Sequence, residues 1–270
     1  MSVAEIVPLV AALFAAGALG GIIAGLLGVG GGIVIVPVLY TLLPFAGVDG
    51  SVQMHLAVGT SLATIIATSA NSARAHHRRG AVDVPLLRSL LLGLVLGVVA
   101  GVIVGGLVSG SALTAVFAVV AIVVAIYMVT LKGRDVDGEH LPGHPWRDAI
   151  GFGIGSISVM MGIGGGTLSV PVFSLFGVPV HRAVGTAAAI GLIIAIPGTI
   201  GFAVTGWGDP NLPFASVGYV NLLGFVLIAP ISALCAPYGA RIAHALPQVW
   251  LSRAFALFLF ITGVRMLTTL

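Results

Sequence analysis

Apolar stretches follow one another along nearly the whole chain, and most are about as long as a helix that crosses a lipid bilayer. The stretch LLLGLVLGVVAGVIVGGLV, residues 90–108, is apolar on every face. Membrane-spanning strands alternate apolar and polar positions, so this uniform pattern favours helices over a membrane β-barrel. The pattern predicts an all-α integral membrane protein.

Ten apolar segments are predicted, five in each half of the chain. They cover residues 7–27, 33–43, 55–74, 85–108, 111–131, 148–162, 167–177, 183–204, 214–236 and 249–268. The second segment of each half is short and rises only about 16 Å as a helix, roughly half the thickness of the hydrocarbon core. We interpret these two segments as half-helices that re-enter the membrane at glycine-rich turns, so that about eight to ten helices span the bilayer.

The two halves repeat the same motifs. LGVGGGIVIVP at residues 27–37 matches MGIGGGTLSVP at 161–171, and HLAVGTS at 55–61 matches HRAVGTA at 181–187. We therefore divide the chain into a first membrane repeat, a polar cytoplasmic linker and a second membrane repeat. These are residues 1–131, 132–147 and 148–270. Internal duplication of this kind recurs in secondary transporters.

Composition agrees with a membrane location, because 59% of the residues are hydrophobic and only 7% are charged, against about a quarter charged in soluble proteins. The first stretch, MSVAEIVPLVAALF, has no basic residue before its apolar run, so we expect this helix to be retained rather than cleaved as a signal peptide. Cys235 is the single cysteine, which excludes an internal disulfide and argues against a cysteine-based metal site. We expect no metal and no other cofactor.

The eleven Lys and Arg residues indicate how the segments are oriented. If the central linker and the loops around Arg78, Arg182 and Arg253 are cytoplasmic, ten of the eleven lie on that side, and the outer loops keep Asp49 and Asp209. This distribution requires two inverted repeats with both termini in the periplasm, whereas parallel repeats scatter the charges over both sides. A basic net charge also suits nucleic-acid binding, but orientation accounts for these residues and we expect no nucleic-acid partner.

If the repeats are inverted, the two glycine clusters are expected to form one site, because turns that enter from opposite faces bring their tips together near the middle of the bilayer. Glycines leave backbone N–H groups accessible, and Pro37 and Pro171 fit early turns of the helices that follow. The first amides of those helices are unpaired and carry partial positive charge, so the predicted guest is an anion. The predicted substrate-binding residues are Gly30, Gly31, Gly32, Thr60, Ser61, Gly164, Gly165, Gly166, Thr167 and Thr186.

Close helix packing is the alternative interpretation of glycine, and we assign it to two stripes at four-residue spacing. The stripes are Gly17, Gly21 and Gly25, and Gly93, Gly97 and Gly101. Consecutive glycines make no single packing face and weaken a helix interior. This difference favours a binding role for the two clusters.

His55 and His181 occupy matching positions before the repeated AVGT sequence, which makes them candidates for handling protons or the anion. Capping of a helix end is the alternative for both. Arg182 is a candidate for drawing anions to the cytoplasmic mouth, with orientation by positive charge as its alternative. No Asp or Glu is expected within the membrane, which weakens an assignment as a cation pump.

Both halves carry motifs that resemble a known family. GLLGVGGGIVIVPVL followed by AVGTSL, and MGIGGGTLSVPVF followed by AVGTA, are similar to the motifs of the TauE/SafE family of sulfite and sulfonate exporters, also called toluenesulfonate uptake permeases. The resemblance implies a multi-pass carrier of the bacterial inner membrane that moves sulfite, sulfoacetate or another organosulfonate, with protons as the candidate coupling ion. It carries over to matched positions in both halves: Gly30, Gly31, Gly32, Pro37, Gly59 and Thr60, with Gly164, Gly165, Gly166, Pro171, Gly185 and Thr186.

The function predicted from the sequence is a secondary transporter of a sulfur-containing anion. An anion channel, or a permease for another small anion, is the alternative, because helix N-termini that bind anions also suit a pore. A membrane-embedded enzyme is disfavoured, since the chain has neither a GxSG serine motif nor HExxH. The direction of transport and the oligomeric state stay open.

Overall fold

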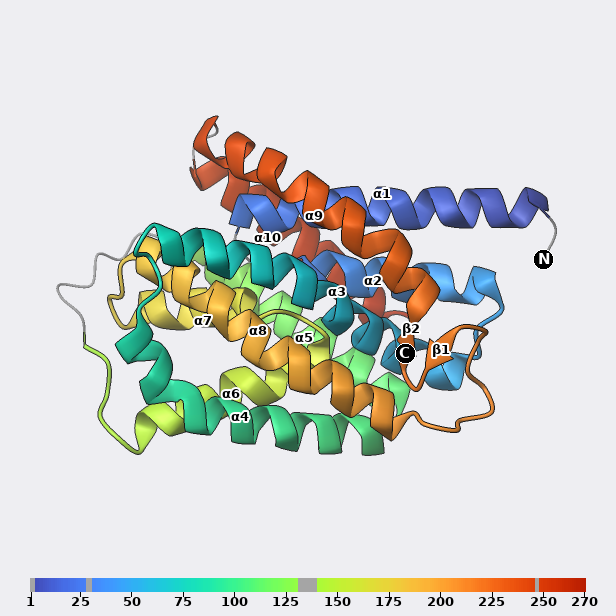
Figure 1. The fold of residues 1–270 in the computed structure, drawn as a ribbon, viewed down its shortest axis with the longest axis horizontal. Helices are drawn as coiled ribbons and strands as arrows, with labels where there is room; N and C mark the ends of the chain where they lie inside the picture. The colour runs from blue at the N-terminus through green and yellow to red at the C-terminus, as the bar shows by residue number, and fades with distance from the viewer. Residues whose placement is uncertain (1–2, 28–30, 131–139, 246–247) are drawn as a thin grey trace.

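The computed structural model describes residues 3–27, 31–130, 140–245 and 248–270. Within these ranges the chain is almost entirely helical (Figure 1), which confirms the predicted all-α class. The elements are α1 (Val3–Leu27), α2 (Gly32–Leu42), the 3₁₀ helix η1 (Leu43–Ala46), α3 (Gly50–Arg78), α4 (Val84–Leu107), α5 (Gly110–Thr130), α6 (Trp146–Met161), α7 (Gly166–Leu175), α8 (Val180–Thr205), β1 (Ser216–Val217), β2 (Val220–Asn221), α9 (Leu222–Ala245) and α10 (Gln248–Leu267).

The helices have the character of membrane spans. Among the described residues, four helices are long and apolar enough to cross a membrane, namely α3, α4, α5 and α8. The outer face of α4 exposes Leu92, Leu96 and Ile103 by half or more of their surface. Such a continuous apolar face suits contact with lipid rather than water.

Each of the ten predicted segments contains a helix, and capping side chains explain where two of the boundaries differ. The third helix begins at Gly50 rather than residue 55, because the Asp49 carboxylate accepts the Ser51 amide at 2.8 Å. The ninth begins at Leu222 rather than residue 214. Residues 216–221 form the β1–β2 hairpin there, and the Asn221 side chain accepts the Gly224 amide at 2.8 Å.

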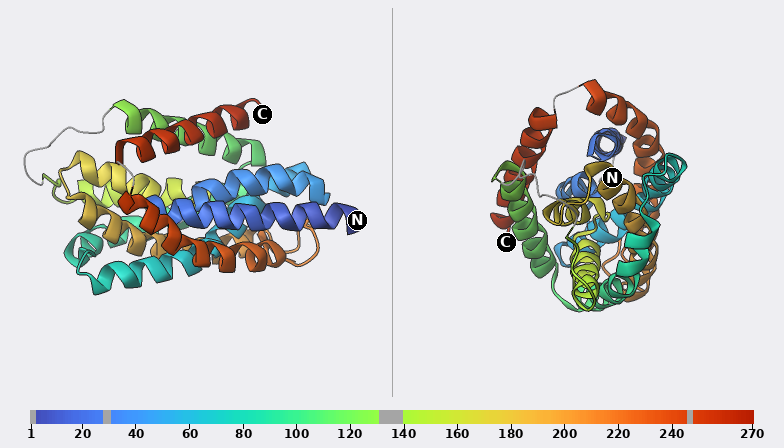
Figure 2. Two further views of the ribbon diagram at one scale, coloured as in Figure 1. Left: turned by 90° about the horizontal axis from the view of Figure 1, so that it is seen from above. Right: turned by 90° about the vertical axis from the view of Figure 1, so that its left-hand side faces the viewer.

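The two short helices diverge from the interior of the molecule. In Figure 1, α2 runs from the middle toward the end that carries the β1–β2 hairpin, and α7 runs toward the opposite end. The long central helices α3 and α8 also run in opposite directions in this view. We call the end with the hairpin, Asp49 and Asp209 the hairpin end, and the end with Arg78, Arg147 and Arg182 the basic end. The described chain termini lie toward the hairpin end (Figure 2).

Helices from the two halves pack reciprocally. Helix α1 lies along α9, and α6 lies along α4, while α3 pairs with α8 and α5 with α10. A Cβ added at Gly17 would lie 2.9 Å from Ile228 O, and one added at Gly151 would lie 2.6 Å from Leu90 O. The two glycines match between the halves at an offset of 134 positions, and Leu90 and Ile228 match at 138. The same backbone contact is therefore made twice.

The glycine stripes assigned to packing make these contacts. Side-chain positions at Gly17 and Gly21 meet the backbone of α9, and those at Gly93, Gly97 and Gly101 meet the backbone of α6. Small residues at such crossings let two membrane helices approach at backbone distance. The predicted packing role is therefore confirmed for the five stripe glycines named here.

Candidate functional site

The first glycine cluster starts α2 inside the protein. Gly31 has φ 75°, a left-handed conformation that glycine adopts without steric cost, and its carbonyl accepts the amides of Val34 and Ile35 at 3.0 and 3.1 Å. The N-cap residue is itself a glycine, so it has no side chain to cap the helix, and Gly31 and Gly32 are buried. The first amides of α2 are therefore the unpaired donors of a helix N-terminus. Gly30, the third predicted member of this cluster, lies outside the described residues.

The second cluster makes an equivalent turn between α6 and α7. Gly162 has φ 66° and ends α6, where the Ile163 amide bonds to Ser158 O at 3.0 Å. Gly165 then starts α7, and its carbonyl accepts the Ser169 amide at 2.8 Å. This helix also lacks a side-chain cap. Gly164, Gly165, Gly166 and Thr167 are all buried, so a second uncapped N-terminus lies in the interior.

The two turns come into direct contact. A Cβ added at Gly32 would lie 2.6 Å from Gly162 O and 3.0 Å from Ser61 Oγ. The Ser61 hydroxyl of α3 donates to Gly162 O at 2.7 Å. Ser61 thus ties the turn of the second half to the helix start of the first. Only glycine at position 32 leaves room for this carbonyl.

Helix α3 then leads from one helix start to the other. Eight residues beyond Ser61, the Ser69 hydroxyl lies 2.6 Å from the Cβ position of Gly191 in α8, and that same point is 3.7 Å from the Gly165 amide nitrogen. Residues 61–69 of a helix rise about 12 Å. The uncapped starts of α2 and α7 are therefore separated by a distance on the order of 12 Å along one face of α3.

Hydroxyl groups gather on the α7 side of this region. Thr167, Ser169 and Ser158 are at most 3% exposed, and none of their hydroxyls has a hydrogen-bond partner among the described residues. A buried polar group without a partner costs about 1–3 kcal/mol. The matching positions of α2 are Ile33 and Ile35, so this polarity belongs to the second half only.

The long central helices show the complementary asymmetry. Ser61 and Thr64 in α3 match Ala187 and Ile190 in α8 at an offset of 126 positions. The Thr64 hydroxyl donates to Ser61 O at 2.7 Å. Polar side chains thus come from α3 of the first half and α7 of the second. Helices α2 and α8 offer apolar side chains at the equivalent places.

Thr60 and Thr186 have another environment. Thr60 Oγ1 accepts the Asn221 amide at 2.9 Å, at the start of α9. Thr186 Oγ1 accepts the Asp83 amide at 2.9 Å, just before α4. These are equivalent bonds at opposite ends of the molecule, because Asp83 and Asn221 match at the offset of 138. Both hydroxyls position the start of a helix from the other half, and their assignment to substrate binding stays a prediction.

The glycine that precedes each of these threonines also contacts the backbone of the other half. Side-chain positions at Gly59 and Gly185 overlap the carbonyl oxygens of Tyr219 and Ala81, respectively. These two partners also match at 138 positions. The repeated AVGT sequence therefore holds a backbone segment of the opposite half at each end, with glycine giving space and threonine accepting the amide.

The two matching histidines lie in different surroundings. His55 is 4% exposed, and its Nε2 lies 3.2 Å from Val108 O. His181 is exposed at the basic end. Arg182 pairs with the Asp83 carboxylate. Burial raises the pKa of Asp83, but the Leu86 amide and the Arg182 guanidinium oppose it and leave the pKa below its ordinary value of 3.8.

The comparisons with known proteins agree with the resemblance found in the sequence. A family profile described as sulfite exporter TauE/SafE matches residues 13–266. The chain belongs to the TauE/SafE family. A protein of Haemophilus influenzae described as "Probable membrane transporter protein" is 37% identical over 252 residues, which cover 93% of this chain and 95% of the relative. No solved structure matches the chain. The family and the relative place this chain among membrane transporters.

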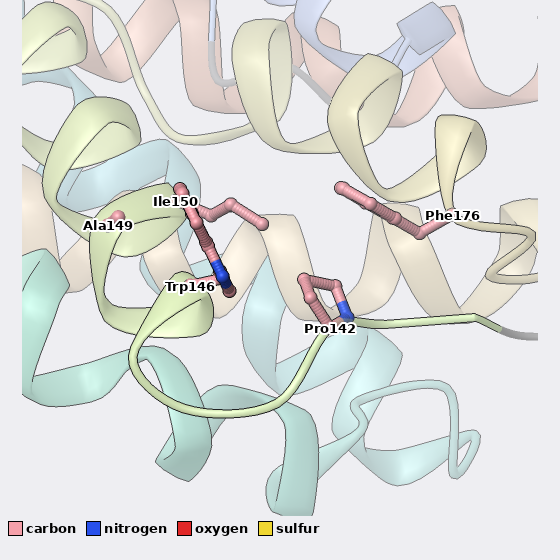
Figure 3. Close-up of a pocket in the computed structure, with 5 residues that line it drawn as sticks. All are labelled: Pro142, Trp146, Ala149, Ile150 and Phe176. Carbon is pink, nitrogen blue, oxygen red and sulfur yellow. The ribbon is translucent and has the colours of Figure 1, made fainter.

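This TauE/SafE protein also has an apolar cavity at its basic end. Figure 3 shows the cavity, which measures about 600 Å³ and is lined by Pro142, Trp146, Ala149, Ile150 and Phe176. None of these side chains carries a charge or a hydroxyl. The indole N–H of Trp146 is the one side-chain donor in this lining, and the lining includes none of the residues of the glycine turns. Among the described residues no group of three His, Cys, Asp or Glu side chains is placed to hold a metal ion.

Sequence reasoning missed several polar residues of this candidate site. Ser69, Ser158 and Ser169 were left out because single hydroxyl residues in apolar segments carry little signal. Comparison of the two halves does distinguish two of these serines, because Ser169 matches Ile35 and Ser69 matches Ala195. Hydroxyls present in one repeat and replaced by apolar residues in the other mark the places where the halves differ in chemistry.

Proposed function

We propose that this TauE/SafE protein is a secondary transporter of a small anion, and that the anion binds at the start of α7 against the hydroxyl-bearing face of α3. The observation that carries the proposal is the buried, uncapped N-terminus of α7 with the Thr167 hydroxyl lacking a partner among the described residues. The donors offered to the anion are the first amides of α7, the Thr167 hydroxyl and the Ser69 hydroxyl.

Several donors must act together for this site to hold a charge. A helix N-terminus contributes about 0.3–2 kcal/mol to a nearby anion, whereas transfer of an ion into a dry interior costs tens of kcal/mol on an idealised estimate of that order. Each charge-assisted hydrogen bond contributes about 1.5–3 kcal/mol. The site therefore needs its amides and hydroxyls together, with some of the anion's water retained.

The substrate class is a sulfur-containing oxyanion such as sulfite, sulfoacetate or another organosulfonate. The family description names sulfite export, and an anion with several acceptor oxygens suits donors that approach from both α3 and α7. Protons are the candidate coupling ion. An anion channel or a permease for another small anion is the second candidate, because helix N-termini at a midplane also suit a pore.

The two halves, residues 1–131 and 148–270, are inverted repeats joined by a cytoplasmic linker at 132–147. Support comes from the reciprocal packing of α1 on α9 and α6 on α4, and from the opposite directions of α3 and α8 in Figure 1. The arginines of the basic end face the cytoplasm by the positive-inside rule. Both termini are then periplasmic, and the protein lies in the bacterial inner membrane.

Transport by purified protein in lipid vesicles tests this proposal. Uptake of radiolabelled sulfite or sulfoacetate is expected to saturate with concentration and to depend on an imposed ion gradient. Gly165→Leu is expected to abolish uptake, because its Cβ alone would lie 2.4 Å from Ile190 Cγ2 and would displace the start of α7, whose amides bind the anion. Gly153→Leu is the matched control, since no atom lies within 4 Å of a Cβ at Gly153. Unchanged uptake by Gly165→Leu contradicts the site, and uptake that never saturates favours a channel.

A further inference from the structure

A second cavity, which is polar, lies at the hairpin end, away from the glycine turns. It measures about 400 Å³ and lies between the start of α3, the turn from α4 to α5, and the β1–β2 hairpin. Its lining includes His55, Ser109, Gly110, Ser111 and Tyr219. Polar groups from three separate elements thus face one small volume.

The start of α5 supplies hydrogen-bond donors to this cavity. Ser109 caps the helix by accepting the Ala112 amide at 3.2 Å, and the Ser109 and Ser111 hydroxyls lie 2.9 Å apart. The first amides of α5, at Gly110 and Ser111, are those that a helix leaves unpaired. They stand at the positive end of a helix of 21 residues.

His55 supplies an independent sign of a ligand. The side chain lines the cavity and is 4% exposed. Because Nε2 lies 3.2 Å from Val108 O, it carries the hydrogen of that bond. Nδ1 has no hydrogen-bond partner among the described residues. In the neutral ring Nδ1 is an acceptor, and in the imidazolium it is a charged donor.

Tyr219 and two carboxylates, Asp209 and Asp49, are the neighbouring groups that bear on the charge of the ring. Tyr219 stacks on His55 with ring centroids 4.7 Å apart, and the Tyr219 hydroxyl donates to the Asp209 carboxylate at 3.2 Å. Asp209 also accepts the Asn211 amide at 3.0 Å. The second carboxylate at this end, Asp49, accepts the amide and hydroxyl of Ser51. Both carboxylates are held by local donors, so their oxygens are turned to those partners.

We infer that this cavity is an outer anion subsite, in which the His55 imidazolium and the first amides of α5 hold the transported oxyanion at the hairpin end of its route. The inference rests on the proposed function, because it takes the cargo to be an anion. Binding takes up a proton at His55, so affinity rises as the pH falls. His181 matches His55 but is exposed at the other end, so the subsite belongs to one end of the molecule.

Sulfoacetate binding to the full chain in detergent tests this inference, because sulfoacetate keeps its charge near neutral pH, where sulfite itself gains or loses a proton. Titrations are run at about pH 6 and about pH 8, on either side of the ordinary histidine pKa. His55→Gln keeps a donor near Val108 O and removes the ring nitrogen that takes up a proton. It is expected to weaken the pH-sensitive component of binding about tenfold or more, as for loss of one charge-assisted hydrogen bond. His77→Gln is the matched control, because His77 is an exposed histidine near Arg78 at the basic end, and it is expected to bind as the unmodified protein does.

A variant from the opposite wall checks that the effect belongs to the cavity. A Cβ added at Gly110 would lie 3.4 Å from Ser51 O, so Gly110→Val fills the space without touching the imidazole bond to Val108. It is expected to remove the same pH-sensitive component. Thr167→Val, by contrast, is expected to weaken only the component that does not depend on pH. Loss of the Thr167 effect would count against the central site, whereas unchanged pH-sensitive binding in His55→Gln would overturn the outer subsite.

Discussion

Thr167→Val separates the requirements of binding from those of folding. Thr167 lies in the first turn of α7, is 3% exposed, and has a hydroxyl without a partner among the described residues. Valine has nearly the same shape, so the substitution removes the hydroxyl with little change in packing. Burial of an unpaired hydroxyl costs about 1–3 kcal/mol. We therefore expect the empty protein to gain about 1 kcal/mol in free energy of unfolding.

The same substitution is expected to weaken the anion complex. A hydrogen bond to a charged group contributes about 1.5–3 kcal/mol, and each 1.4 kcal/mol is about tenfold in affinity. The loss should be about 10- to 100-fold in sulfite affinity at the central site. Thr167→Ser keeps the hydroxyl and is expected to keep most of the affinity. Thr199→Val is the matched control, because Thr199 donates to Ala195 O of its own helix at 2.7 Å.

Two measurements on one preparation give the test. Thermal unfolding without anion reports the stability of the empty protein, and titration with sulfite reports affinity. We expect the stability and the sulfite affinity to change in opposite senses for Thr167→Val and to stay nearly constant for Thr199→Val. Lower stability combined with unchanged sulfite affinity would refute it, since the hydroxyl would then support the fold instead of the ligand.

Three further predictions concern packing, pH and orientation. Gly151→Ala is expected to lower the free energy of unfolding by about 1–3 kcal/mol, because its Cβ would lie 2.6 Å from Leu90 O. Gly153→Ala has open space around its Cβ and is expected to be neutral or stabilising by up to about 1 kcal/mol. Equal unfolding temperatures of the two variants would disprove this contrast. The pKa of Asp83 is lowered in the folded protein, so its contribution to stability is present above the ordinary value of 3.8 and disappears as the pH falls through the lowered pKa. Asp83→Asn should therefore flatten the acid side of a plot of unfolding temperature against pH, and a plot unchanged from that of the unmodified protein contradicts the role of the Arg182 pair. Cysteines introduced near the two chain ends are expected to react with an impermeant thiol reagent from outside the cell, and reaction at one end alone would rule out inverted repeats.

Most of the architecture could be predicted because helix length and apolar pattern are local properties. The ten segments, the short α2 and α7, and the packing stripes at Gly17 and Gly93 all follow from spacing along the chain. The glycine clusters could also be recognised, because consecutive glycines are poor in any helix interior. Gly32 contacts Gly162 of the other half, but the starts of α2 and α7 lie on the order of 12 Å apart along α3, so a single site shared by both helix starts stays a prediction.

The roles of individual polar side chains could not be predicted in the same way. Substrate binding by Thr60 and Thr186 stays a prediction, whereas the amide that each accepts comes from a segment more than one hundred residues away and could not be foreseen. These hydrogen-bond partners depend on how the two halves pack together, and no local sequence pattern determines that packing. The β1–β2 hairpin before α9 was missed for a similar reason, since its six residues lie within an apolar run and Asn221 decides where the helix begins.

The most direct test of the central claim is the position of a bound anion. Selenite has the same pyramidal XO₃ shape as sulfite with a heavier central atom, and its anomalous scattering locates it in crystals of the full chain. The account predicts a selenium peak within hydrogen-bond distance of the Gly165 and Gly166 amides and the Thr167 hydroxyl. A well-occupied peak elsewhere, with this region holding none, would contradict it.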